Sequence, residues 1–237
     1  MANWQKIVQF YAAKAPAKLA MNPADSVARL TLFVAETPRQ SLLPLTTLVK
    51  IDPATRTVRV GNRRGDMLTI SADLRQTDSL HLPSPPSDAL RLSAKGEFSY
   101  LLMGLMDPND QTAGQIWSVG KVVRDSLRQP VQMATGDFNR DGQLDVVTCE
   151  FGHNIGRLSA FFKTGNTYQE LVLDAVPGAR RVIVRDVNVD GWPNILALLT
   201  QGDEQVAGYY SKTANLKKRY SSASRPFMAL PSSNWPI

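Results

Sequence analysis

The sequence predicts an all-β protein made of about four antiparallel units of four short strands each, preceded by one N-terminal α-helix. From residue 41 onward, short runs rich in branched apolar residues alternate with clusters of turn-forming residues. In addition, the motif Asp-x-Asn-x-Asp-Gly occurs at residues 137 and 186, which lie 49 positions apart. A repeat of about 50 residues with about four strands is typical of propeller blades, so we expect a partial β-propeller.

Residues 1–20 are expected to form the amphipathic helix. Trp4, Ile7 and Tyr11 are spaced by three and four positions, which places them on one face of a helix. Pro16 ends this pattern, because a proline disfavours the helical conformation of the residue before it. A single apolar stripe on a helix of this length predicts that the helix packs against another part of the protein.

Residues 41–211 are expected to hold the blades. Turn-forming sequences such as Asp-Pro-Ala-Thr at residues 52–55 and Asp-Pro-Asn-Asp at residues 107–110 separate the expected strands. Two apolar runs lead into the repeated motif and two leave it, so each motif lies in a loop between two strands. The expected strands are at residues 48–51, 57–60, 67–70, 89–92, 98–105, 114–119, 131–135, 145–149, 157–163, 168–173, 181–185 and 195–199.

Residues 212–237 show neither a period of two nor one of 3.6, and we expect this tail to be irregular or disordered. The tail also holds five basic and no acidic residues. Because the whole chain has a net charge of +6, the part before the tail has a charge of only +1. The basic composition therefore belongs to the tail, and nucleic-acid binding is disfavoured.

Several function classes lack their sequence signals. The single cysteine, Cys149, permits no intramolecular disulfide and no Cys-x-x-Cys-His haem attachment, and we expect it to be a small buried strand residue. No apolar run approaches the roughly 18 residues of a membrane-spanning helix. The sequence also contains no phosphate-binding glycine motif and no plausible Ser/His/Asp or Cys/His set, so we expect a protein that is not an enzyme.

The two loop motifs carry the chemistry that the sequence indicates most clearly. From Asp137 to Asp145, side-chain oxygens occur at the first, third, fifth and ninth positions, with Gly142 at the sixth. Ca²⁺ takes six to eight oxygen ligands, and a glycine permits the sharp turn that aims them at one point. An EF-hand would also need flanking helices and a glutamate at position twelve, where this chain has Thr148 and Ala197 in apolar runs. We therefore expect two calcium loops between strands.

These loops and their flanking strands resemble the FG-GAP or VCBS repeat family, the blades of integrin-α-like β-propellers, most specifically over residues 130–211. The resemblance implies Ca²⁺ as the cofactor and a set of ligands in each loop. In the second loop, an asparagine replaces the family's last aspartate, so we expect that site either to bind more weakly or to be a structural relic. The implied ligands are Asp137, Asn139, Asp141, the Gln143 carbonyl and Asp145 in the first loop, and Asp186, Asn188, Asp190, the Trp192 carbonyl and Asn194 in the second.

The two ends of the chain suggest a longer parent protein. The pattern around Trp4, Phe10 and Pro16 resembles the last helix of a cytochrome c-like domain, which implies that the chain starts inside a longer protein. For the tail, our hypothesis is that a frameshift has replaced further blades, since a neighbouring reading frame of residues 219–231 can encode an apolar run. The coding DNA tests this hypothesis.

The function expected from these observations is a non-catalytic, calcium-binding module for binding or scaffolding in an extracellular or periplasmic setting, with an unknown protein or carbohydrate ligand. Two alternatives belong to other classes: part of a propeller lyase that acts on polysaccharide, and the redox partner of an upstream cytochrome c-like domain. Self-association through open blade edges is a further possibility, because unpaired strand edges favour pairing with another chain.

Overall fold

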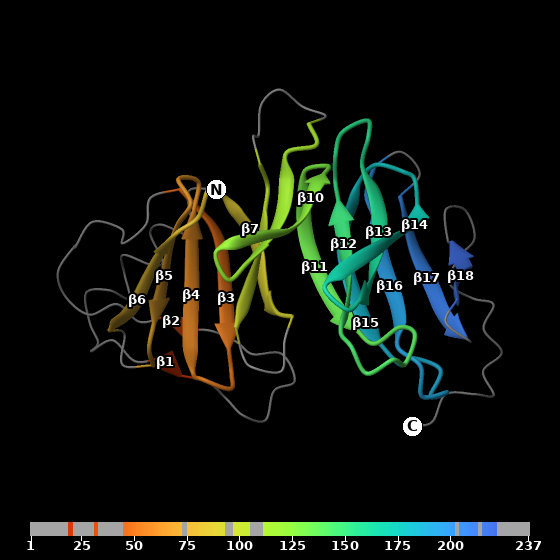
Figure 1. Cartoon of the computed structure of the whole chain (residues 1–237), viewed down its shortest axis with the longest axis horizontal. Coiled ribbons are helices and arrows are strands. Elements are labelled where there is room, and N and C mark those ends of the chain that lie inside the picture. The colour runs from red at the N-terminus through yellow and green to blue at the C-terminus, as the bar shows by residue number, and fades with distance from the viewer. Residues whose placement is uncertain are drawn as a thin grey trace. The chain divides into compact units, whose positions relative to one another are not determined.

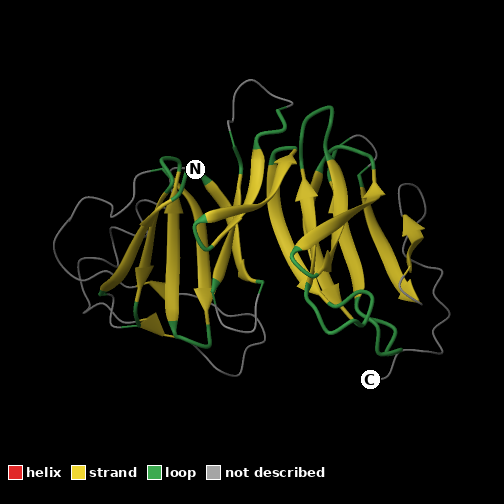
Figure 2. Ribbon diagram, in the orientation of Figure 1, coloured by secondary structure: helices red, strands yellow, loops and turns green. Residues whose placement is uncertain are grey.

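The computed structural model describes residues 19–20, 31–32, 45–72, 75–92, 97–104, 111–201, 204–212 and 215–221. Within these residues every regular element is a strand, which confirms the all-β prediction (Figure 2). The helix expected at residues 1–20 lies outside the described residues except at its end, where Leu19–Ala20 form strand β1. This strand pairs antiparallel with β2, Thr31–Leu32, so the end of the expected helical range is extended.

The chain divides into two compact units, Met1–Pro86 and Ser87–Ile237. The first unit contains one antiparallel sheet of four strands in sequential order, which we call blade 1 (Figure 1). Polar turn residues join its strands: the Asn62 side chain accepts hydrogen bonds from the backbone N–H groups of Arg64 and Asp66, both at 2.9 Å. The strands are β3 (Thr46–Asp52), β4 (Thr57–Asn62), β5 (Asp66–Ile70) and β6 (Gln76–His81).

The second unit contains three further four-stranded antiparallel sheets, again in sequential order, which we call blades 2, 3 and 4. Blade 2, whose first strand begins at the unit boundary, has β7 (Pro86–Arg91), β8 (Phe98–Leu102), β9 (Gly114–Ser118) and β10 (Lys121–Leu127). Blade 3 has β11 (Pro130–Gly136), β12 (Asp145–Glu150), β13 (Arg157–Thr164) and β14 (Thr167–Asp174). Blade 4 has β15 (Ala179–Arg185), β16 (Asn194–Leu199), β17 (Gln205–Lys212) and β18 (Asn215–Ser221).

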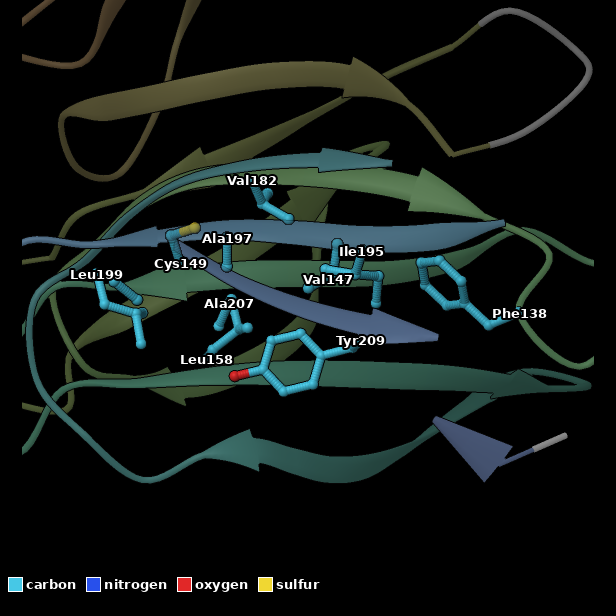
Figure 3. Close-up of a cluster of buried hydrophobic side chains, with 11 residues drawn as sticks. Phe138, Val147, Cys149, Leu158, Val182, Ile195, Ala197, Leu199, Ala207 and Tyr209 are labelled. Carbon is cyan, nitrogen blue, oxygen red and sulfur yellow. The ribbon is translucent and has the colours of Figure 1, made fainter. Parts of the chain in front are cut away.

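Two apolar clusters hold the blades of the second unit together. One lies between blades 3 and 4, and Figure 3 shows it, including Phe138 of the first loop. The other joins Leu101 and Ile116 of blade 2 to Phe161 of blade 3. Full burial of one large apolar side chain contributes about 1.5–3 kcal/mol, so these clusters are the main source of cohesion between the blades. As expected, Cys149 is buried, and burial raises the pKa of its thiol to about 12.

Side-chain hydrogen bonds between the first strands of successive blades identify equivalent positions in the repeat. Thr47 Oγ1 donates to the Pro86 carbonyl at 2.7 Å, and Ser87 Oγ donates to the Pro130 carbonyl at 2.8 Å. One position further along, Asp88 Oδ2 accepts from the Met133 N–H at 3.1 Å, and Gln132 Oε1 accepts from the Val182 N–H at 2.7 Å. Thr47 is therefore equivalent to Ser87, Asp88 is equivalent to Gln132, and Met133 is equivalent to Val182.

The first part of the segment 212–237, expected to be irregular, is a strand of blade 4. Strand β17 ends at Lys212, and β18 pairs with β17 over Asn215–Ser221, so the start of the 212–237 segment belongs to blade 4. Leu216 packs against the core between blades 3 and 4. An outer strand such as β18 can be held by a ladder of backbone hydrogen bonds and one apolar contact. Neither feature requires alternating polar and apolar residues, so the sequence shows no strand pattern here. Residues 222–237 lie outside the described residues.

Candidate cation loops

The first candidate loop joins β11 to β12, and its side-chain oxygens form bonds to the backbone of the same loop. Asp137 accepts from the Asp141 N–H at 3.0 Å through Oδ1 and from the Gly142 N–H at 2.9 Å through Oδ2. Gly142 has φ of +81° with open space where a Cβ would lie, so the turn requires the backbone freedom of glycine. The Asp137 carboxylate therefore holds the turn closed.

Asp141 lies at the centre of the loop and is kept ionised by its neighbours. It accepts bonds from the Gln143 N–H at 2.8 Å, from Asn139 Nδ2 at 3.0 Å and from Gln143 Nε2 at 3.2 Å. The bond from the Gln143 backbone and then the bond from Asn139 lower the pKa of this exposed carboxyl. Asp141 thus offers a full negative charge at the loop surface.

Asp145 is the buried member of the first loop. Its Oδ2 accepts from the Phe138 N–H and its Oδ1 accepts from the Lys163 N–H of β13, both at 2.9 Å, and the residue has no exposed surface. Burial raises the pKa of this carboxyl, the two backbone bonds partly oppose that rise, and the charges of Asp141 and Asp137 add to it. A nearby divalent cation would lower this pKa, since an opposite charge favours the ionised form.

The second loop joins β15 to β16 and repeats this geometry. Asp186 accepts from the Asp190 N–H at 3.2 Å and from the Gly191 N–H at 2.7 Å. Asp190 in turn accepts from the Trp192 N–H at 2.9 Å and from Asn188 Nδ2 at 2.7 Å. Gly191 has φ of +81°, the value seen at Gly142. The two loops therefore share the same hydrogen-bond pattern as well as the same sequence motif.

The two loops differ at their last position. Asn194 Oδ1 accepts from the Val187 N–H at 2.9 Å, as Asp145 accepts from Phe138. The other atom, Asn194 Nδ2, is buried and makes no hydrogen bond within the part of the chain that the structure describes. An amide nitrogen cannot accept a backbone N–H as the second oxygen of Asp145 does. Compared with Asp145 in the first loop, Asn194 therefore lacks both a negative charge and one hydrogen bond to the backbone.

The chemistry of the donors fits a hard cation, since every expected ligand supplies oxygen. Among the described residues, however, no group of three His, Cys, Asp or Glu side chains is arranged to hold a metal ion. In the first loop, both Asp145 oxygens accept backbone N–H bonds and Asp141 accepts bonds from its own loop. The predicted ligands of each site therefore lie in one loop, but among the described residues they form no group of three carboxylates around a common point.

A contact between the two loops was not predicted from the sequence. The Arg140 guanidinium lies over the Trp192 ring, 4.0 Å from its centroid. The same guanidinium is close to Gly191, where a Cβ would come within 2.7 Å of Arg140 Nη2. The contact depends on how blades 3 and 4 pack, and the only sequence signal for it is the occurrence of an arginine and an aromatic residue in matching loops.

The fold and the loops define a β-propeller-like protein built from four-stranded antiparallel blades. Neither a protein-family model nor a curated protein matches the sequence. Among solved structures, the chain is similar to the WD40 domain of Pan2 from Neurospora crassa, with 11% identity and a TM-score of 0.47. That match covers 74% of this chain and 49% of the other, so this chain spans about half of that structure's length. Among the described residues, no helix is long and apolar enough to cross a membrane.

Proposed function

We propose that this chain is a non-catalytic, calcium-binding β-propeller module of FG-GAP or VCBS type. The observation that supports the proposal best is the pair of loops with the same hydrogen bonds and the same left-handed glycine, 49 residues apart. Each loop joins the first two strands of a blade. An ion at the first loop would offset the repulsion that Asp141 and Asp137 exert on Asp145, and it would stabilise the folded state because binding to the native protein adds to its stability.

The first loop is the stronger site in this proposal. It has three aspartates, of which Asp145 is buried and would gain most from a nearby positive charge. The second loop has two aspartates and an asparagine at the buried position. Fewer negative ligands give a lower Ca²⁺ affinity, so the two loops should fill at different concentrations.

The test compares thermal melting of the full chain with and without Ca²⁺. Saturation of a site at about 100 times its dissociation constant adds about 2.7 kcal/mol of stability, which raises the melting temperature measurably. We expect this rise to be lost in Asp141→Ala and reduced less in Asp190→Ala. The matched control is Asp125→Ala, an exposed carboxylate on β10 that lies outside both loops.

The quantity to compare is the change that Ca²⁺ causes in each variant, because removing a loop hydrogen bond also changes the stability of the ion-free protein. A wild-type protein whose melting temperature does not respond to Ca²⁺ would contradict the proposal. So would an unchanged Ca²⁺ response in Asp141→Ala.

We also propose that the module works outside the cytoplasm and binds a protein or carbohydrate. A site with few charged ligands needs the high Ca²⁺ concentrations found outside cells, since extracellular modules have dissociation constants of about 10⁻⁴–10⁻³ M. Cell fractionation tests the location, and a calorimetric titration gives the dissociation constant. A location in the cytoplasm together with a Ca²⁺-independent protein would argue against this setting.

A further inference from the structure

Blade 4 presents an apolar face on the side away from blade 3. Ile183 on β15, Leu198 on β16 and Val206 on β17 are 50%, 38% and 43% exposed. Leu198 pairs directly with Val206 across the sheet, so these side chains lie on the same face. Adjacent exposed apolar side chains on three strands are typical of an interaction surface rather than of scattered surface residues.

The repeat shows what kind of surface fits this face. Leu198 lies 49 positions after Cys149, and the pair Leu198–Val206 corresponds to the pair Cys149–Leu158 in blade 3. Cys149 and Leu158 have no exposed surface, because blade 4 covers them. The exposed face of blade 4 is therefore built like a face that is covered by the next blade. The surface that fits it best is the face with which a blade of the same repeat packs on the preceding blade.

The chain carries such an opposite face on blade 1. By the equivalence of Thr47 with Ser87, the position of Val49 in blade 1 is that of Ala89 in blade 2. Val49 is 56% exposed and shares its face with Val60, its cross-strand partner. The equivalent residues of blades 3 and 4, Met133 and Val182, face the preceding blade and are buried. Ala89, at the equivalent position of blade 2, is buried as well.

We propose that these two faces bind each other between two copies of this chain, with the Val49 face of one copy packed on the Leu198 face of another. A contact between the blade 4 faces of two copies is disfavoured. Arg181 lies beside Leu198 on this face, so the Arg181 side chains of the two copies would repel each other. The Val49 face supplies Val60 and Leu68 in register and brings no like charge at those positions. The contact is head-to-tail and either closes into a ring or continues as a filament.

The experiment is sedimentation velocity of the full chain over a wide range of protein concentration. We expect the wild-type protein to associate, and Val49→Lys and Leu198→Lys each to remain monomeric at every concentration. Val206→Lys is a second variant on the blade 4 face and should behave as Leu198→Lys does. The matched control is Leu171→Lys on β14, where the leucine is 40% exposed, and it should associate like the wild type. Circular dichroism checks that each variant is folded.

Mixing the two single variants distinguishes a head-to-tail contact from other modes. Val49→Lys keeps an intact blade 4 face and Leu198→Lys keeps an intact blade 1 face, so an equimolar mixture should form a dimer and nothing larger. Three results would overturn the proposal: a wild-type protein that is monomeric throughout, a Val49→Lys protein that still associates, or a mixture that stays monomeric. None of these results depends on Ca²⁺, so the calcium proposal stands or fails separately.

Discussion

The substitution Asp145→Asn tests how the first loop is held in the absence of an ion. Both oxygens of this fully buried carboxylate accept backbone N–H bonds at 2.9 Å, from Phe138 and from Lys163. An amide has one acceptor oxygen, so in either orientation its NH₂ group faces one of these N–H groups. A buried donor without a partner costs about 1–3 kcal/mol.

A second effect acts in the opposite direction. Burial raises the pKa of the Asp145 carboxyl, which means that the ionised form is disfavoured in the folded protein, and the neutral amide removes that penalty. The lost hydrogen bond is the larger effect, because the Lys163 N–H is fixed in β13 and the Phe138 N–H belongs to a fully buried loop residue, so neither can turn to water. We therefore expect a net loss of about 1–2 kcal/mol in Ca²⁺-free buffer.

Urea unfolding of the full chain in Ca²⁺-free buffer measures this loss as a change in the free energy of unfolding. The companion variant Asn194→Asp makes the reverse change in the second loop. It replaces the buried Nδ2 atom with an acceptor and adds the missing charge, so the Ca²⁺-induced rise in melting temperature should increase. If Asp145→Asn shifts the free energy of unfolding by less than about 0.5 kcal/mol, the bonds to Phe138 and Lys163 do not hold the loop as described.

Two further predictions concern buried polar groups outside the loops. Glu150 is fully buried, accepts the Arg128 N–H at 2.8 Å and lies 3.5 Å from Arg157 Nε, so Glu150→Gln should cost about 1–3 kcal/mol in urea unfolding; an unchanged unfolding curve would contradict this. Tyr209 donates to Asp174 at 2.7 Å, so Tyr209→Phe should cost about 1 kcal/mol near neutral pH. Burial and this bond raise the pKa of Tyr209, so the unfolded state ionises first and the wild type loses stability above about pH 10. That alkaline loss should be smaller in the phenylalanine variant, and equal losses would refute the assignment.

The strands next to the cation motifs could be predicted because each is a short run bounded by a repeated turn motif, although the alternating burial expected for residues 145–149 is wrong, since every position of β12 is buried. Strand β16 is mostly apolar, β12 centres on the apolar pair Val146 and Val147, and both strands are bounded by the repeated loops. The outermost strands β6 and β10 were not predicted, because most of their side chains face solvent and do not alternate in polarity. Strand β18 was not predicted either, because its lysines and arginine resemble a disordered tail in the sequence. An outer strand is held by its ladder of backbone hydrogen bonds, which polar and apolar side chains permit equally.

The candidate site could be predicted only within each loop. The positions of Gly142 and Gly191 follow from local turn chemistry, and so do the bonds that the aspartates make to the loop backbone. The stacking of Arg140 on Trp192 and the unmatched nitrogen of Asn194 depend on neighbouring strands and blades. Such contacts arise from packing between segments far apart in the sequence, which no local pattern encodes.

The burial of Cys149 makes blade separation measurable by a chemical reaction. The thiol lies in the core between blades 3 and 4, and its raised pKa leaves almost none of the reactive thiolate at neutral pH. An alkylating reagent can therefore modify it only after that core opens. Because the chain has one cysteine, the labelling rate reports opening at a single site. The parting of blades 3 and 4 can thus be timed in the unmodified sequence, without any engineered probe.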